Sequence, residues 1–81
     1  MRKYAGFLDY LNKLNDDRLV FKFIEIESLS GVSLPPSAYK NPRYWQPSPR
    51  HTFPIAILEC GYYIEQVDLK NQTLSLSKSA K

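Results

Sequence analysis

Residues 61–78, GYYIEQVDLKNQTLSLSK, form the most regular stretch of the sequence. Apolar and polar side chains alternate over Tyr62–Asp68 and again over Thr73–Lys78, a period of two that is typical of half-buried β-strands. Residues 69–72 (LKNQ) separate the two runs and have the length of a hairpin turn. The sequence therefore predicts a C-terminal β-hairpin.

A third strand is predicted nearer the N-terminus. Over Arg18–Phe23 the side chains of Leu19, Phe21 and Phe23 share one side of the extended chain. Before it, apolar residues recur every three or four positions over Lys3–Asn15, which predicts a helix with one buried face. We expect this strand to pair with the hairpin in a three-stranded antiparallel sheet with helices on one face, an α+β fold.

Further short helices are predicted between this strand and the hairpin. Glycine stops a helix, whereas proline begins or breaks one, and both residue types punctuate this region. The predicted elements are a helix at 23–31 ended by Gly31, a helix after Pro36 ended by Pro42, an irregular connection at 43–52, and a helix at 53–60 capped by Thr52 and ended by Gly61. The fold class is thus a small α+β domain with three to four short helices. With helix 53–60 set aside, the element order is that of a winged helix, a likeness that does not settle function.

The length of 81 residues has room for one domain, so we expect residues 1–81 to form a single unit with a frayed polar tail at 77–81. A hydrophobic share of 43% and a charged share of 23% are typical of a folded chain. Eleven basic and eight acidic residues leave a net charge of only +3, which dictates no particular class of partner.

The excess charge lies in the centre of the chain. No carboxylate occurs between Glu27 and Glu59, whereas Lys40, Arg43 and Arg50 all lie in that interval. All six prolines, the only tryptophan and the only histidine lie there too. We therefore expect the two ends to form a neutral scaffold and the centre to carry the binding surface.

The sequence lacks the patterns of enzymes and metalloproteins. It has no nucleophile with a base, no carboxylate pair and no glycine-rich phosphate loop at workable spacing. His51 and Cys60 are too few ligands for a metal site, so we expect a non-enzymatic protein with no cofactor and no metal. The lone Cys60 favours a reducing compartment, and no segment approaches the roughly 20 apolar residues of a membrane span. We expect a cytoplasmic protein with no membrane partner.

The candidate binding surface is the segment 39–51, YKNPRYWQPSPRH. Its cations interleave with aromatic residues, and this suits nucleic acid because Lys and Arg neutralise phosphates while exposed rings stack on unpaired bases. The same side chains suit an acidic protein surface, since Tyr, Trp and Arg are enriched at binding hot spots. In a third interpretation, the rings of Tyr44 and Trp45 simply fill the core, and the basic residues around them are solvated. The candidate site residues are Tyr39, Lys40, Arg43, Tyr44, Trp45, Arg50 and His51.

A pattern extends over nearly the whole chain: FIEIE at 23–27, Gly31, LPPSAY at 34–39, Tyr44-Trp45, Gly61-Tyr62 and Val67-Asp68. It resembles a family of small domains of unknown function in bacterial and phage genomes, whose pattern is F-x-E-I-E, G, L-P-x-S-A, W-W, then G-W-x-V and V-D. The present chain has tyrosine at 44 and 62 where that family usually has tryptophan. The resemblance implies a standalone domain, with no assigned activity and no catalytic residues to transfer.

Two hypotheses follow for the function. The first is a small nucleic-acid-binding module that acts through the basic, aromatic, proline-rich central segment. The alternative is a protein-binding inhibitor or adaptor, for instance a phage-encoded antagonist of a host defence enzyme, that uses the same surface. The sequence leaves the oligomeric state open.

Overall fold

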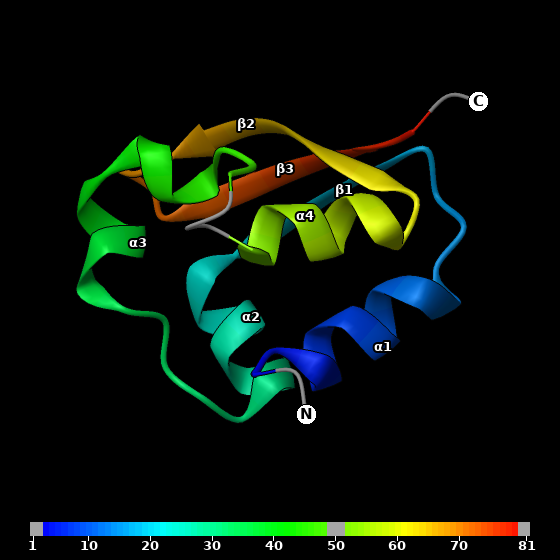
Figure 1. Cartoon of the computed structure of the whole chain (residues 1–81), viewed down its shortest axis with the longest axis horizontal. Helices are drawn as coiled ribbons and strands as arrows, with labels where there is room; N and C mark the ends of the chain where they lie inside the picture. Colours follow the sequence, from blue (N-terminus) through cyan, green and yellow to red (C-terminus); the bar gives the residue numbers. More distant parts are fainter. Residues whose placement is uncertain (1–2, 49–51, 80–81) are drawn as a thin grey trace.

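In the computed structural model, which describes residues 3–48 and 52–79, a three-stranded antiparallel sheet forms one layer and the helices pack on one side of it (Figure 1). The elements are α1 (Ala5–Lys13), β1 (Arg18–Lys22), α2 (Phe23–Ser30), α3 (Pro36–Lys40), the 3-10 helix η1 (Pro42–Trp45), α4 (Thr52–Glu59), β2 (Tyr62–Asp68) and β3 (Thr73–Lys78). The predicted α+β fold, with one strand added to a C-terminal hairpin, is confirmed.

The strand order is β1-β3-β2, so β3 lies in the centre and the other two strands form the edges of the sheet. Val20 and Gln66 both pair with Ser75, which places these three side chains in one row on the outer face of the sheet. The register shifts by one residue between Ile64 and Gln66, and Glu65 is therefore a β-bulge in β2.

The core lies between the inner face of the sheet and the helices. Leu74 and Leu76 of the central strand are fully buried there, as are Phe7 of α1, Ile26 of α2 and Ile57 of α4. Burying a side chain of this size stabilises the fold by about 1.5–3 kcal/mol. The apolar faces that the sequence predicts for the first helix and the strands are therefore the faces that the fold buries.

Two glycines end helices as predicted. Gly31 follows α2 with φ 73° and Gly61 follows α4 with φ 91°, both in the left-handed region that glycine reaches without a steric penalty. The helix after Pro36 also ends before Pro42 as predicted. Thr52, predicted as a cap, is instead the first residue of α4.

The structure corrects two further predictions. The connection expected to be irregular from residue 43 begins with η1, whose start is held by the Asn41 side chain, which accepts the Arg43 N–H at 3.0 Å. The tail expected to fray from residue 77 is ordered through 79, because the N–H groups of Lys78 and Ser79 donate to the carbonyls of Asp17 and Gly61, each at 2.8 Å. Positions 80–81 of that tail lie outside the described residues.

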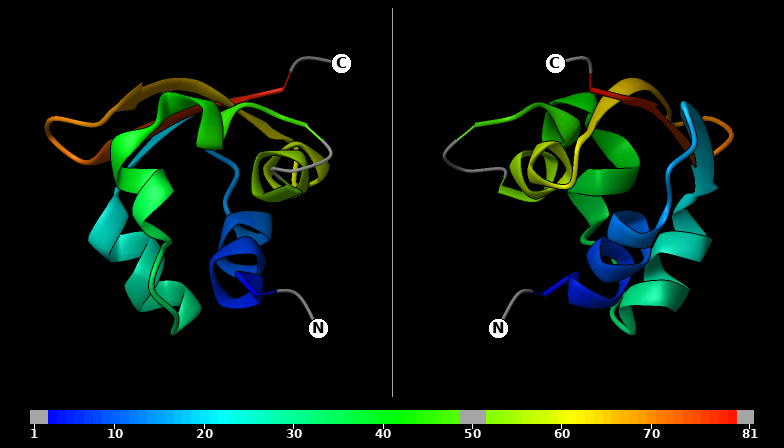
Figure 2. Two further views of the ribbon diagram at one scale, coloured as in Figure 1. Left: turned by 60° about the vertical axis from the view of Figure 1, so that its left-hand side comes forward. Right: turned by 90° about the vertical axis from the view of Figure 1, so that its right-hand side faces the viewer.

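Helices α1 and α2 lie side by side beneath the sheet (Figure 2), and Gly6 sits where they meet. A Cβ atom at Gly6 would lie 2.1 Å from the carbonyl oxygen of Leu29, far inside van der Waals contact. The clash would be with backbone, which cannot rotate away as a side chain can. Glycine at this position therefore permits the close approach of the two helices.

We predict that Gly6→Ala lowers the free energy of unfolding by about 2 kcal/mol, because a clash at 2.1 Å with backbone puts the cost near the upper end of the roughly 1–3 kcal/mol of overpacking, and the gain in helix propensity returns only about 1 kcal/mol. Urea denaturation followed by circular dichroism measures the change. Asn12→Ala, at an exposed position of the same helix, is the control and should not destabilise the protein. A Gly6→Ala protein as stable as the wild type would contradict this account of the helix contact.

Candidate functional site

Trp45 is a core residue. Its side chain is 2% exposed, its ring stacks on Phe23 with centroids 5.2 Å apart, and its Nε1–H donates to the carbonyl of Ala38 at 3.0 Å. A buried indole whose N–H has a partner is a well-packed anchor. The interpretation of Trp45 as core is confirmed, and its use as an exposed stacking ring is wrong.

Tyr44 and Tyr39 are also held by the fold. Tyr44 is half-buried and its hydroxyl lies 3.3 Å from the hydroxyl of Tyr4, and burial together with this hydrogen bond raises the pKa of Tyr44. The ring of Tyr39 packs edge-on against Phe23 with centroids 5.2 Å apart. Desolvation, with a hydrogen bond to the Glu27 carboxylate, raises the pKa of Tyr39 to about 12. Both rings therefore fasten α3 and η1 to the body of the protein.

The candidate cations divide into two groups. Lys40 at the end of α3 and Arg43 in η1 are exposed, as a surface that meets a charged partner requires. Arg50 and His51 lie outside the described residues. Helix α3 has five residues, so it is too short to present the two exposed turns of a DNA recognition helix.

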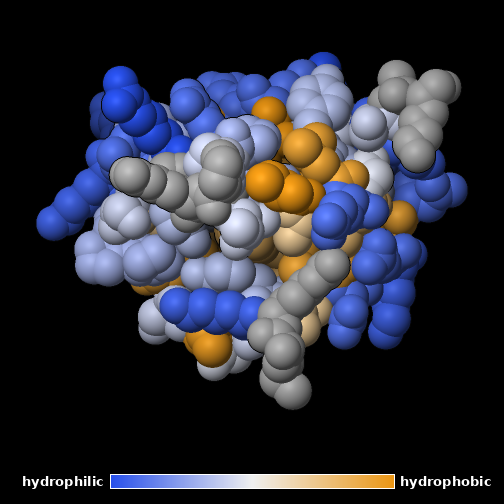
Figure 3. All heavy atoms as spheres, viewed as in Figure 1, coloured by the Kyte–Doolittle hydropathy of each residue, from blue (hydrophilic) through white to orange (hydrophobic). Residues whose placement is uncertain are grey.

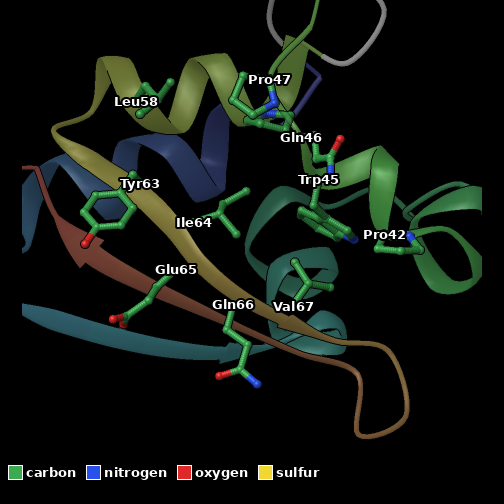
Figure 4. Close-up of a pocket in the computed structure, with 11 residues that line it drawn as sticks. Pro42, Trp45, Gln46, Pro47, Leu58, Tyr63, Ile64, Glu65, Gln66 and Val67 are labelled. Atoms are coloured by element: carbon green, nitrogen blue, oxygen red, sulfur yellow. The ribbon is translucent and has the colours of Figure 1, made fainter.

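A groove of about 350 Å³ lies between the free edge of β2, the segment from Pro42 to Pro47, and α4 (Figure 4). Its lining is mostly apolar, and the buried Trp45 contributes one side of it. The lining residues are Pro42, Trp45, Gln46, Pro47, Pro54, Leu58, Tyr63, Ile64, Glu65, Gln66 and Val67.

The two strand positions at the centre of the groove, Ile64 and Val67, point toward Trp45, whereas the bulged Glu65 points away (Figure 4). Glu65 accepts a hydrogen bond from the Ser77 hydroxyl at 2.8 Å and lies 3.4 Å from the Arg18 guanidinium. Its carboxylate is therefore engaged on the outer face of the sheet, and the groove itself stays mostly apolar.

Two large apolar side chains on this side of the molecule are exposed to solvent, Leu58 at 42% and Tyr63 at 41%. Apolar atoms also gather over α4 on the face shown in Figure 3. Neither residue is among the predicted site residues, because the predicted surface is the cationic, aromatic segment 39–51 and both residues lie outside it. The segment TFPIAILE at 52–59 does indicate an exposed apolar side chain on this helix. The helix is apolar on all sides, and so small a protein cannot bury every side of it.

Among the residues that the structure describes, neither a metal site nor a membrane-spanning helix is found. Across 3–48 and 52–79 there is no group of three or more His, Cys, Asp or Glu placed to hold a metal ion. Over the same ranges no helix combines the length and apolar character needed to cross a bilayer. Cys60 is half-buried, with its thiol 3.7 Å from the Leu8 carbonyl, so it is packed against α1.

The sequence matches the model of a protein family described as a domain of unknown function, DUF7662, over residues 4–79. The chain belongs to this family. The resemblance to small domains of unknown function is thereby confirmed. No curated protein and no solved structure matches the chain.

We predict that the fluorescence of the single tryptophan of this DUF7662 domain is that of a buried indole. The emission maximum of Trp45 should be blue-shifted relative to the urea-unfolded chain, and iodide should quench it several-fold less, because the ring is 2% exposed. Steady-state fluorescence with an iodide titration measures both quantities. Equal quenching in the folded and unfolded protein would place the indole at the surface and contradict the core assignment.

A second prediction concerns Tyr39. Because its folded pKa of about 12 exceeds the ordinary tyrosine pKa of 10.0, the unfolded chain loses the proton first, and the free energy of unfolding should fall as pH rises from about 10 to about 12. Urea unfolding across this range should show a smaller fall in Tyr39→Phe than in the wild type. Ser37→Ala, an exposed change without a titrating group, should keep the wild-type profile. An unchanged profile in Tyr39→Phe would refute the assignment.

Proposed function

We propose that this DUF7662 domain is a non-enzymatic protein-binding module, an adaptor or inhibitor, whose partner places an apolar side chain in the groove beside β2. The observation that carries the proposal is the exposure of Leu58 and Tyr63 next to an apolar groove of about 350 Å³. Both side chains line the groove, Leu58 from α4 and Tyr63 from β2, and contiguous exposed apolar patches mark protein–protein interaction sites.

The partner's chemistry follows from the charges near the groove. Pro42 lines the groove, and the exposed Arg43 follows it directly in η1. Lys40 is exposed three residues earlier, and the one carboxylate in the groove lining, that of Glu65, is bonded to Ser77 on the outer face of the sheet. A protein segment with an apolar anchor and neighbouring carboxylates therefore complements this surface.

Burial on binding supplies the driving force. Full burial of a leucine-sized side chain contributes about 1.5–3 kcal/mol, so the partner's anchor supplies the largest share, and covering what remains exposed of Leu58 and Tyr63 adds a smaller one. The groove is bounded by a strand, a helix and η1 with its buried tryptophan, and it is therefore preformed. Preformed sites lose little conformational entropy on binding.

Nucleic-acid binding through the central segment 39–51 stays a prediction. Lys40 and Arg43 are available to phosphates. The geometry supports this function less well, because Trp45 is buried and the two tyrosines are fastened to Phe23 and Tyr4, which removes the rings expected to stack on bases.

The test is selection of a displayed library of random linear peptides on the immobilised domain. We expect recovered sequences to share an apolar anchor beside Asp or Glu, and Leu58→Lys to weaken a recovered synthetic peptide about tenfold or more, the loss of roughly one anchor side chain. The control is Ile24→Lys on α2, which makes the same kind of change at an apolar residue that is more exposed (63% against 42%) and does not line the groove, and it should leave the affinity within about twofold.

Two results would overturn the proposal. One is the failure of any shared sequence to emerge, and the other is equal binding by Leu58→Lys and the wild type. A parallel titration with single- and double-stranded oligonucleotides tests the competing function: salt-dependent binding that Lys40→Ala with Arg43→Ala abolishes would favour nucleic acid.

A further inference from the structure

The second edge of the sheet, β1, lies on a different surface with its own exposed apolar side chains. Among the described residues, six large apolar side chains are exposed, and only Leu58 and Tyr63 belong to the groove beside β2. The other four lie on or next to β1: Val20 at 66% exposed on β1 itself, Tyr10 on α1, and Ile24 and Leu29 on α2.

The hydrogen-bond pattern shows which backbone groups of β1 face outward. The Phe23 N–H donates to the Gln72 carbonyl and the Lys78 N–H to the Asp17 carbonyl, each at 2.8 Å. Bonded pairs alternate along an antiparallel ladder, so Leu19 and Phe21 bond to β3 while Arg18, Val20 and Lys22 direct their N–H and C=O groups to the free edge. The Lys22 N–H accordingly bonds to the Glu25 carboxylate at 2.7 Å instead of to a strand.

A hollow of about 300 Å³ lies beneath this edge, on the helix side. Tyr10 from α1, Phe21 from β1 and Leu29 from α2 line it, with Glu25 and Ser28. A strand added to β1 would direct every second side chain over this hollow and the others onto the outer face beside Val20. The edge thus combines the outward-facing backbone groups of Arg18 and Val20 with a place for apolar side chains, while the Lys22 N–H is already bonded to Glu25.

The charges on β1 select the occupant. On the outer face Val20 is flanked by the exposed Lys22 and by Arg18, whose side chain lies 3.4 Å from Glu65 and is still 76% exposed, so it can meet a second carboxylate. If a second copy paired antiparallel about Val20, Arg18 of each copy would face Lys22 of the other, and like charges directly opposite destabilise a ladder. A segment with carboxylates in those two positions would instead be attracted at both ends.

We propose that the edge of β1 is a second binding site, at which an extended protein segment adds a fourth strand to the sheet. The segment has three consecutive apolar residues with one acidic residue on each side. The central apolar residue pairs with Val20, the two acidic residues lie opposite Arg18 and Lys22, and the two intervening side chains cover Tyr10 and Leu29. Main-chain hydrogen bonds supply affinity and the charges supply specificity, as in other strand additions. This site is independent of the groove beside β2.

The probe is the acetylated and amidated heptapeptide Thr-Glu-Leu-Val-Leu-Glu-Thr, titrated into the ¹⁵N-labelled protein at low ionic strength. We expect shifts centred on the amide of Val20 and slower hydrogen exchange there. Replacing both peptide glutamates by lysine should weaken binding about tenfold or more, since two attractive contacts become repulsive. N-methylation of the central valine should abolish binding, because that N–H donates to the Val20 carbonyl.

Charge reversal in the protein provides the matched control. Arg18→Glu with Lys22→Glu should invert the preference, so that the lysine peptide binds more tightly than the glutamate peptide. Lys40→Glu with Arg43→Glu makes the same change in net charge elsewhere and should keep the wild-type preference. Leu58→Lys should also leave this titration unchanged, which separates a failure here from a failure of the groove beside β2.

Three results would overturn the proposal. These are no shift at Val20 with either peptide, equal affinity for the glutamate and lysine peptides, and shifts confined to Leu58 and Tyr63. Protection of the Val20 amide that grows with protein concentration in the absence of peptide would identify a second copy as the occupant instead, and would equally reject an acidic partner.

Discussion

The fold depends on a chain of aromatic contacts through the core. Phe7 of α1 lies 5.1 Å from Phe21 of β1 and 5.8 Å from Phe53 of α4, measured between ring centroids. Phe53 lies 5.7 Å from Trp45 of η1, which lies 5.2 Å from Phe23 at the start of α2. Five elements from both halves of the sequence therefore share one set of ring contacts. In a protein of 81 residues, where the core is small, such contacts supply much of the stability.

The same packing shapes the groove beside β2. Because the Trp45 ring is drawn into the core, η1 is held near the edge of β2 and its neighbours Pro42, Gln46 and Pro47 form the opposite wall. The tryptophan thus contributes to the candidate site as a support for the groove and not as a ligand-stacking ring. Proline suits this wall, since its fixed φ keeps an irregular segment in place without a ladder of hydrogen bonds.

A three-stranded open sheet has two edges, and here the two differ in chemistry. Beside β2 lies an apolar groove with cations beyond it, and Glu65 at the bulge is turned to the outer face. On β1 the cations are part of the strand and flank one exposed valine. Charged side chains on an edge strand oppose pairing between identical chains, and the bulge in β2 interrupts a regular ladder. Both features disfavour edge-to-edge pairing of identical chains.

The local elements were readable from the sequence, because they depend on neighbours within a few residues: alternation over Tyr62–Asp68 and Thr73–Lys78, and helix ends at Gly31 and Gly61. The site was not. Whether Trp45 is exposed depends on Phe23 of α2 and Phe53 of α4, two separate helices that the tertiary packing brings against the indole. Likewise, Ile57 is buried and its neighbour Leu58 is not, although both are apolar and adjacent in one helix. Burial is a property of the packed surfaces, and the packing sets which of many similar side chains faces a partner.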